Sequence, residues 1–510
     1  MRTPRAWWAL SGLVAGALGL AMSYAAAALL HVRESPVVAV AEGVTALTPG
    51  AVVKWAINTF DRDDKTVLVV GILVILGLVF ALLGRAARRR WWVAVTGYVV
   101  LAGIAFLAVA TKPTPALTDY VPVVVGLLCW VVVLAVLAEW LRRWELVEGE
   151  GPGPEPTHTR RHFFVAVGGA AALAAAAGLV GRVAGSARRK AEASRRLLRI
   201  EGVTAPVVPD GVELTIDGLA PWETPSDNFY LIDTTFIKPA IEPADWTIRI
   251  HGMVEREITL TYRELVSREI TQDWITLNCV SNPVGGELVG NAWWSGVRLA
   301  GILAEAGPHP DADAVLQTSD DGWTCGTPLA AMMDDRNAML AVAMNGEPLP
   351  IEHGFPVRTI VPGLYGYVSA TKWVVDMEVT TFDRVTAYWT EKGWAEQGPV
   401  KIASRIDVPD QGDVPAGDVL CAGLAWFQHT GISKVEVQLD GGAWQEAQLA
   451  HAANTDTWVQ WRRMLRLDEG QHQIRVRAVD LEGNVQTGAI ADVLPDGATG
   501  WHTIDVTAKA

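Results

Sequence analysis

Apolar residues follow two different patterns along the chain. Near the N-terminus they form long runs, each close to the ~20 residues that a helix needs to cross the hydrocarbon core of a membrane. These runs lie at about Trp7–Leu30, Val67–Leu83, Trp92–Ala110, Val121–Ala138 and Phe163–Val180. They predict an all-α transmembrane bundle of five helices within residues 1–185. From Val212 onwards the apolar segments are short and are interrupted by polar residues, as in a globular domain.

Short alternating segments predict an α+β domain over residues 212–390. Strand-like alternation occurs at Trp246–Ile250, Ile258–Leu260 and Trp274–Leu277. Thr261 and Glu264 have the spacing of a capping box, which predicts a short helix to Arg268. Ser295 is the predicted cap of a further helical segment that ends near Leu303.

Residues 395–510 read as strands at short spacing, separated by turn signals such as Asp440-Gly441-Gly442 and Glu482-Gly483-Asn484. The predicted strands are Val419–Ala425, Lys434–Leu439, Trp458–Leu465 and Gln473–Ala478. This pattern predicts an immunoglobulin-like β-sandwich.

Charges in the loops predict how the bundle is oriented. Arginines gather before the first run, after the second, and between the fourth and fifth. By the positive-inside rule the N-terminus is cytoplasmic and the domain after the fifth run is extracytoplasmic. Arg160-Arg161, before the fifth run and after a linker at Gly149–Thr159, resembles a twin-arginine export signal, although two ordinary stop charges are the alternative. A basic linker over residues 186–211, helical at Ala184–Arg199, conflicts with that orientation unless it lies on anionic lipid.

Composition narrows the classes of function. The 510 residues carry a formal net charge of −14, which argues against nucleic acid as a partner. Cys129, Cys279, Cys325 and Cys421 form no CxxC pair and no zinc spacing. The five runs contain no histidine, and His31 lies only at the edge of the first, so no haem is expected in this chain. Charges within the runs are scarce, which argues against a transporter.

Cys279 stands out because it follows a predicted strand and opens a Gly-rich loop, Val280–Asn291. Such a loop lets the backbone approach a ligand closely. A thiol in this place suits a soft-metal ligand or a nucleophile, while a buried free cysteine is the alternative. Cys325 and Cys421 fit packed thiols, although Cys325 could also lie near a bound cofactor.

The stretch Asp273–Leu303 (DWITLNCVSNPVGGELVGNAWWSGVRLAGIL) and the run Asn345–Trp373 (NGEPLPIEHGFPVRTIVPGLYGYVSATKW) resemble the sulfite-oxidase family of molybdenum-cofactor enzymes. The resemblance covers roughly residues 213 to 505, and the final part resembles the family's dimerisation domain. It implies a molybdenum–molybdopterin cofactor, a homodimer, and Cys279 as the metal ligand and a catalytic residue.

The same resemblance implies residues that contact the pterin. His353 and Arg358 match the family's pterin-binding His and Arg. The other matching positions are Asn228, Phe229, Tyr230, Thr318, Ser319, Ala370, Thr371 and Lys372.

Departures from the family pattern bear on the substrate. Arginines that surround the anion in sulfite oxidases are replaced here by Pro283, Val284, Trp293, and Val368 or Ser369. The active-site tyrosine position holds Trp323. Trp293, Trp294 and Trp323 therefore suggest an aromatic, less charged pocket, with Trp293 and Trp323 as candidate catalytic-site residues and ordinary core tryptophans as the alternative. His251 and Arg298 are further polar candidates.

Together these features predict a multi-pass cell-membrane protein whose extracytoplasmic domain transfers an oxygen atom to or from a small-molecule substrate. Both directions, sulfite-like oxidation and sulfoxide-like reduction, remain open. Electrons would pass to or from a separate partner, a quinone or a cytochrome. The alternative is a membrane-anchored scaffold or adhesion protein that has lost the cofactor on the same fold.

Overall fold

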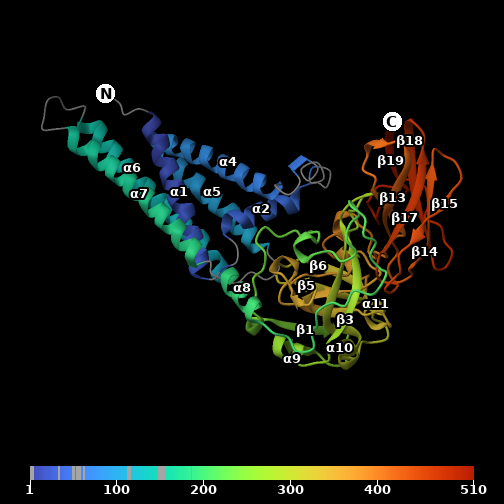
Figure 1. Cartoon of the computed structure of the whole chain (residues 1–510). Helices are drawn as coiled ribbons and strands as arrows, with labels where there is room; N and C mark the ends of the chain where they lie inside the picture. The colour runs from blue at the N-terminus through green and yellow to red at the C-terminus, as the bar shows by residue number, and fades with distance from the viewer. Residues whose placement is uncertain are drawn as a thin grey trace. The chain divides into compact units, whose positions relative to one another are not determined.

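Two compact units divide the chain in this computed structural model, which describes residues 5–30, 32, 35–48, 52, 59–60, 64–111, 117–147, 156–184 and 187–510. The first unit is helical and comprises Met1–Arg188 with Thr235–Lys238. The second comprises Arg189–Thr234 and Pro239–Ala510 and is rich in strands. Figure 1 shows both units and labels their elements.

In its described residues, the helical unit holds five helices that are long and apolar enough to cross a membrane. They overlap the five predicted runs and belong to α1 (Arg5–Leu29), α4 (Asp64–Ala87), α5 (Trp91–Ala110), α6 (Val121–Val147) and α7 (Pro156–Ala184). The sequence did not predict the shorter α2 (Pro36–Leu47), which starts with proline at its first turn. Three predicted features lie outside what the structure describes. They are most of the Gly149–Thr159 linker, His31 and the side chain of Arg160.

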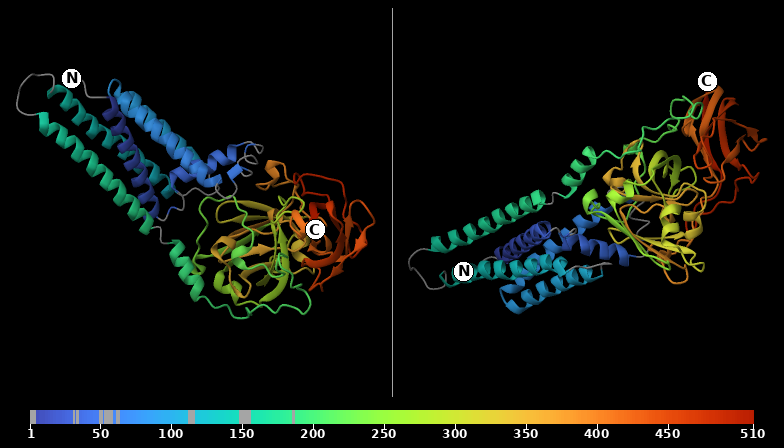
Figure 2. Two further views of the ribbon diagram at one scale, coloured as in Figure 1. Left: turned by 45° about the horizontal axis from the view of Figure 1, so that its top comes forward. Right: turned by 90° about the horizontal axis from the view of Figure 1, so that it is seen from below.

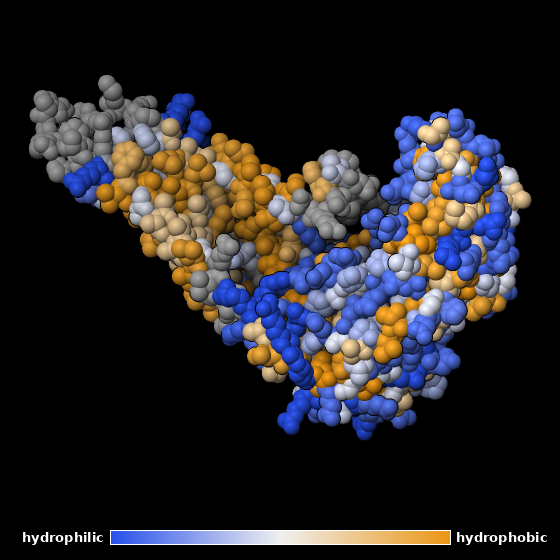
Figure 3. Space-filling model, in the orientation of Figure 1, coloured by the Kyte–Doolittle hydropathy of each residue, from blue (hydrophilic) through white to orange (hydrophobic). Residues whose placement is uncertain are grey.

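Glycines allow helix α1 to pack closely inside this unit. A Cβ built on Gly84 of α4 would lie 2.2 Å from the carbonyl oxygen of Trp8, and one on Gly12 would lie 2.0 Å from that of Phe80. The Trp130 indole donates to the carbonyl of Gly16 (3.1 Å). Small residues at such crossings are typical of helix packing in lipid. The helices run side by side in Figure 2, and hydrophobic residues dominate the face of the unit seen in Figure 3.

Helix α8 (Ala187–Leu197) occupies the predicted basic linker and packs on the second unit for most of its length. Ala191 is fully buried. Arg195 bonds Glu192 at 3.0 Å and donates to the carbonyl of Pro348 at 3.3 Å. At least part of the basic face is therefore engaged with protein.

A five-stranded sheet forms one layer of the α+β domain, in the order β2-β1-β10-β5-β6. Its strands are β1 (Thr247–Gly252), β2 (Ile258–Thr261), β5 (Ala314–Ser319), β6 (Thr324–Pro328) and β10 (Val374–Thr380). β1 and β10 pair in parallel, and the other neighbours are antiparallel. The predicted strands at Trp246–Ile250 and Ile258–Leu260 correspond to β1 and β2.

A second sheet follows the order β3-β4-β7-β8, with β9 paired to β7. Its strands are β3 (Thr271–Asn278), β4 (Val289–Arg298), β7 (Met339–Met344), β8 (Glu347–Pro348) and β9 (Arg358–Ile360). Leu340 and Val342 of β7 face one hydrophobic core, whereas Met339 and Ala341 face another. The sheet is therefore buried on both sides, as its continuous apolar run suggests.

The predicted helix cap at Ser295 is wrong. Ser295 is a buried residue of β4 whose hydroxyl donates to the Gln272 side chain at 2.9 Å. Helix α10 begins later, at Leu299, and ends at Ala306, before Gly307 in the left-handed conformation. A strand that is buried on both faces lacks the polar–apolar alternation that would have marked it.

Two short helices complete this domain. α9 (Tyr262–Val266) has the predicted capping box, with Thr261 and Glu264 bonding each other's backbone. α11 (Leu329–Met333) buries Leu329 and Met332 in the same core as α10.

The C-terminal residues form two sheets that enclose a hydrophobic core. The sheet orders are β11-β13-β17-β16 and β12-β19-β18-β14-β15. The strands are β11 (Ala403–Val408), β12 (Gly412–Pro415), β13 (Gly417–Trp426), β14 (Ile432–Leu439), β15 (Gln445–Glu446), β16 (Gln448–Leu449), β17 (Val459–Leu467), β18 (Gly470–Asp480) and β19 (His502–Lys509). The four predicted strands lie within β13, β14, β17 and β18, apart from Trp458. The immunoglobulin-like character of this two-sheet unit stays a prediction.

Thr276 of β3 joins this C-terminal region to the α+β domain. Its hydroxyl accepts from the backbone N–H of Trp458 at 2.8 Å, and its carbonyl accepts from the Gln428 side chain at 3.1 Å. The strand that leads to Cys279 is thus fixed from both domains.

Candidate functional site

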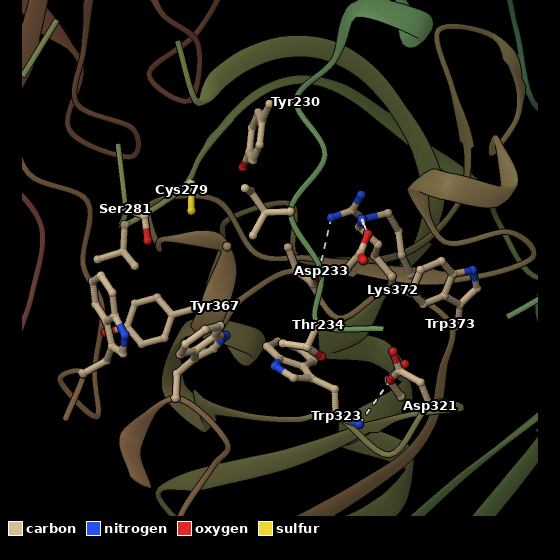
Figure 4. A pocket seen from close by; sticks show the side chains of 18 of the residues that line it. Tyr230, Asp233, Thr234, Cys279, Ser281, Asp321, Trp323, Tyr367, Lys372 and Trp373 are labelled. Carbon is tan, nitrogen blue, oxygen red and sulfur yellow. Dashed lines mark hydrogen bonds and ion pairs between the residues drawn. The ribbon is translucent and has the colours of Figure 1, made fainter. Parts of the chain in front are cut away.

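A cavity of about 870 Å³, counted out to its open mouth, lies in the strand-rich unit. Figure 4 shows Cys279 and Ser281 on one side and Lys372 and Trp373 on the other. The lining side chains come from six stretches of chain and are Phe229, Tyr230, Ile232, Asp233, Thr234, Cys279, Val280, Ser281, Ser319, Asp321, Trp323, Arg358, Tyr367, Ala370, Lys372, Trp373, Trp389 and Trp394, with Gly366.

Cys279 follows the last residue of β3 and directs its thiol into the cavity (Figure 4). Its backbone is fixed by two bonds, from its own N–H to Leu288 (2.9 Å) and from the N–H of Asn282 to its carbonyl (3.1 Å). Burial raises the pKa of the thiol, and hydrogen bonds from Ser281 partly oppose that rise. A cation bound at the sulfur would favour the thiolate, because metal ligation requires deprotonation.

Arg358 brings a buried positive charge to the opposite wall. Its guanidinium donates to the carbonyls of His353 (3.1 Å) and Ala370 (3.3 Å). Burial lowers its pKa to about 10. Among the described residues no carboxylate forms an ion pair with it, so the side chain is suited to an incoming anion.

His353 lies behind this wall and does not line the cavity. It donates from Nε2 to the carbonyl of Ser226 at 3.0 Å and packs edge-on against Phe229. Burial, followed by the charges of Lys372 and Arg358, lowers its pKa to about 3. His353 is therefore a neutral residue that orients the chain around Arg358.

Lys372 forms an ion pair with Asp233 at 3.2 Å, and both side chains are almost fully buried. Asp233 belongs to the same irregular stretch as Phe229 and Tyr230. The pair therefore ties this stretch to the segment that follows Ala370.

A fully buried polar network holds the segment around Ala370 in place. The Thr359 hydroxyl donates to Gln317 (2.7 Å) and accepts from the backbone N–H of Thr371 (2.8 Å). Gln317 in turn donates to Thr327 (2.6 Å), whose hydroxyl donates to the carbonyl of Val368 (2.6 Å). The wall that carries Ala370 and Lys372 is therefore bonded to β5, β6 and β9.

The structure gathers most of the sequence-predicted residues at the cavity. Lining side chains are Phe229, Tyr230, Cys279, Ser319, Trp323, Arg358, Ala370 and Lys372. Thr371 is buried behind this wall, within the network just described. Two others do not reach the cavity: Asn228 is exposed in a single 3-10 turn, and Thr318 precedes Ser319 on β5.

Several other candidates lie elsewhere. Trp293 packs against Trp274 on the face of β4 away from the cavity. His251 hydrogen-bonds to Asp376 at 3.0 Å, and the exposed Arg298 bonds carbonyls of the turn after α11. Cys325 is buried against Thr327, and burial raises the pKa of its thiol to about 11.

Among the lining residues that sequence reasoning missed are Asp233, Asp321, Tyr367, Trp389 and Trp394. Tyr367 stands inside the run that carried the resemblance, so its aromatic ring was an available signal. The two tryptophans come from the irregular segment after β10, where only their unusual density marks them.

The part of the chain that carries this site is similar to known proteins. Residues 235–389 match the model of the oxidoreductase molybdopterin binding domain. The uncharacterized oxidoreductase YuiH of Bacillus subtilis (strain 168) is 31% identical over 153 residues, which are 30% of this chain and 74% of that protein. The mitochondrial sulfite oxidase of Rattus norvegicus is 28% identical over 299 residues, 50% of this chain and 54% of that one. The chain thus spans about half the length of this sulfite oxidase.

The fold has a counterpart among solved structures. The crystal structure of the sulfane dehydrogenase SoxCD from Paracoccus pantotrophus has a TM-score of 0.50 and 23% sequence identity. The match covers 60% of this chain and 91% of that chain. At this identity the likeness concerns the fold alone.

Proposed function

Because the chain belongs to the sulfite-oxidase family of molybdopterin-dependent oxidoreductases, we propose that it transfers an oxygen atom to or from a small substrate at a molybdenum held by Cys279. The family implies a molybdenum–molybdopterin cofactor. The direction of transfer stays open in this proposal.

Three features of the cavity fit this cofactor. Arg358 offers a buried cation without an acidic partner among the described residues, which suits the phosphate end of a pterin. The Ser319 hydroxyl is a buried group of the lining that lacks a hydrogen-bond partner among the described residues. Such groups are costly unless a ligand satisfies them. Cys279 offers sulfur, which suits a soft transition metal.

Each side chain then has a defined task. The bound cofactor supplies the two-electron redox chemistry and the oxygen exchange. Cys279 holds the metal end, and Arg358 and Lys372 face the anionic end. His353 and the Thr359 network keep these donors in position, so that little reorganisation accompanies binding.

The remaining parts of the proposal concern the setting. Five long apolar helices support anchoring in a cell membrane, and the loop arginines favour a catalytic domain on the extracytoplasmic side. Arg160-Arg161 would then serve as an export signal. A separate quinone or cytochrome would carry the electrons, and the C-terminal two-sheet unit, taken as immunoglobulin-like, would form a homodimer.

The observation that carries the proposal is the presence, on the walls of one cavity, of a thiol and a buried guanidinium that forms no ion pair with a carboxylate of the described residues. The test is the molybdenum and pterin content of the full-length protein, made in a host that supplies the cofactor, beside Cys279→Ser and Cys279→Ala. We expect about one molybdenum per chain in the wild type and loss of the metal and of molybdenum-dependent turnover in both variants. Cys421→Ser, a buried cysteine of β13, is the matched control.

Two outcomes would count against this assignment. Cys279→Ala with full activity would remove Cys279 as the ligand. A folded wild-type protein with neither metal nor pterin would favour the alternative, a cofactor-less scaffold on the same fold.

A further inference from the structure

An aromatic cluster lines part of the cavity. Trp389 and Trp394 line it from the segment between β10 and β11, and Tyr367 and Trp323 line it from two other loops. The ring centroids of Tyr367 and Trp394 are 6.0 Å apart, and those of Trp389 and Trp394 are 6.3 Å apart. Contacts of this length are typical of packed aromatic pairs.

The segment that carries the two tryptophans is fixed at both ends. The backbone N–H of Tyr388 donates to the Thr324 hydroxyl of β6 at 3.0 Å. The carbonyl of Ala395 accepts from the Tyr367 hydroxyl at 2.7 Å, and its N–H donates to Pro495 at 2.8 Å. Gly393, at φ 90°, makes the intervening turn. The rings are therefore held in place before any ligand arrives, which reduces the entropy lost on binding.

Charge is distributed unevenly around the cavity. Among the described residues that line it, the only cations are Arg358 and Lys372. Lys372 forms an ion pair with Asp233. Lys372 and Asp233 lie across the cavity from Cys279 and Ser281 (Figure 4). Figure 4 shows Tyr230, Ser281 and Tyr367 on the same side of the cavity as the thiol, and all three are uncharged lining residues. An oxyanion on this side would lose its hydration without gaining a guanidinium partner.

We propose that Tyr367, Trp389 and Trp394 form an aromatic specificity wall, and that the substrate is an uncharged molecule that carries an apolar or aromatic group next to its oxygen-donating or oxygen-accepting atom. The inference rests on the proposed function, since it takes the Cys279 side of the cavity as the reacting end. The wall accepts the apolar group, and the uncharged surroundings of Ser281 discriminate against sulfur and nitrogen oxyanions.

Isothermal titration of the full-length, molybdenum-loaded protein in detergent tests this wall. The probes are methyl phenyl sulfoxide, dimethyl sulfoxide and sulfite, which differ in the aromatic group and in charge. We expect methyl phenyl sulfoxide to bind about tenfold more tightly than dimethyl sulfoxide, and sulfite to bind most weakly. Trp389→Ala and Trp394→Ala should bring the two sulfoxides to nearly equal affinity.

Controls separate the wall from the fold and from the cofactor. Trp394→Leu keeps an apolar side chain without the ring, so it should retain the cofactor and still lose the preference. Trp444→Phe removes an indole of the C-terminal unit that contacts Trp501 outside the cavity, and should leave the preference intact. The same samples are assayed for molybdenum, and absence of the metal from the wild type would contradict the proposed function instead.

Three results in molybdenum-loaded protein would contradict the proposed specificity wall. They are sulfite binding more tightly than methyl phenyl sulfoxide, failure of both sulfoxides to bind, or an aromatic preference that survives in all three variants at Trp389 and Trp394. Loss of the preference in those variants alone would support it.

Discussion

The guanidinium of Arg358 lies over the indole ring of Trp294, with 5.1 Å between its central carbon and the ring centroid. Trp294 is fully buried, and its own N–H donates to the carbonyl of Ile275 at 3.1 Å. A cation over an aromatic face is partly compensated for the water it has lost. The domain can therefore keep a positive charge at the cavity wall without a permanent carboxylate, and that leaves the charge available to an anionic ligand.

Replacement of this cation should separate binding from folding. We expect Arg358→Met to lose most of the bound pterin while the cofactor-free protein stays at least as stable as cofactor-free wild type. Burial lowers the pKa of Arg358 from 12.5 to about 10, a cost on the order of 3 kcal/mol for the charged form that the variant avoids. The measurements are pterin content and denaturant unfolding of both cofactor-free proteins.

Arg249→Met is the control for that experiment, because Arg249 is exposed on β1 and pairs with Glu257 at 2.9 Å. It should change neither quantity. Retention of pterin in Arg358→Met would contradict the anion-binding role.

The Thr359 network gives a second prediction, about position and not charge. Thr359→Val leaves the side-chain oxygen of Gln317 and the backbone N–H of Thr371 without their buried partner, so the free energy of unfolding should fall by about 1–3 kcal/mol. The loaded protein should also release its pterin faster, because the segment at Ala370 and Lys372 loses its bond to the Thr359 hydroxyl and keeps only the backbone bond from the Thr359 N–H to the Thr371 carbonyl (2.9 Å) at this point. Thr359→Ser retains the hydroxyl and should behave as wild type. A Thr359→Val variant with normal stability and normal pterin release would contradict the role of this network in holding the segment in position.

The sequence predicted site residues well where they lie in a long, distinctive sequence motif. Cys279 and Arg358 lie in such motifs, and both line the cavity. Trp293 and Trp294 were both expected at the pocket, but neither lines the cavity. Alternation along β4 puts the two side chains on opposite faces, Trp293 against Trp274 and Trp294 beneath Arg358.

Other features depend on tertiary contacts that no local pattern encodes. Asp233, Trp389 and Trp394 come from segments without regular periodicity, and they reach the cavity only because distant strands hold those segments there. The fold was easier to predict where burial is one-sided, as in β1, whose exposed and buried residues alternate. Strand β4, buried on both faces, was taken for a loop and a helix.

The contact between α1 and α4 predicts which glycines matter in the helical unit. Gly84→Ala should lower the stability of this unit by about 1–3 kcal/mol, because the new Cβ would lie 2.2 Å from the carbonyl oxygen of Trp8. Gly71→Ala, on the same helix, is the matched control, since a Cβ there meets nothing within 4 Å among the described residues. The measurement is loss of the helical circular dichroism signal during titration with sodium dodecyl sulfate in mixed micelles. Equal midpoints for the two variants would contradict close packing at Gly84.

Buried His353 predicts how stability depends on pH. Its pKa is lowered from 6.5 to about 3, first by burial and then by Lys372 and Arg358, so between these pH values the unfolded chain binds a proton that the folded protein excludes. Stability therefore falls as pH falls through this window, and His353 contributes a slope of up to about 1.4 kcal/mol per pH unit.

We expect His353→Gln to weaken that slope below about pH 6.5, while at neutral pH it changes stability only through the lost packing against Phe229 and the altered bond to Ser226. The measurement is the difference between the unfolding free energies of variant and wild type, taken by denaturant titration at several pH values, because carboxylates common to both proteins cancel in the difference. His451→Gln, at an exposed histidine of the C-terminal unit, is the control. A difference that stays constant from neutral pH down to about pH 4 would mean that His353 takes up its proton in the folded protein. The assignment of His353 as a neutral residue behind Arg358 would then be wrong.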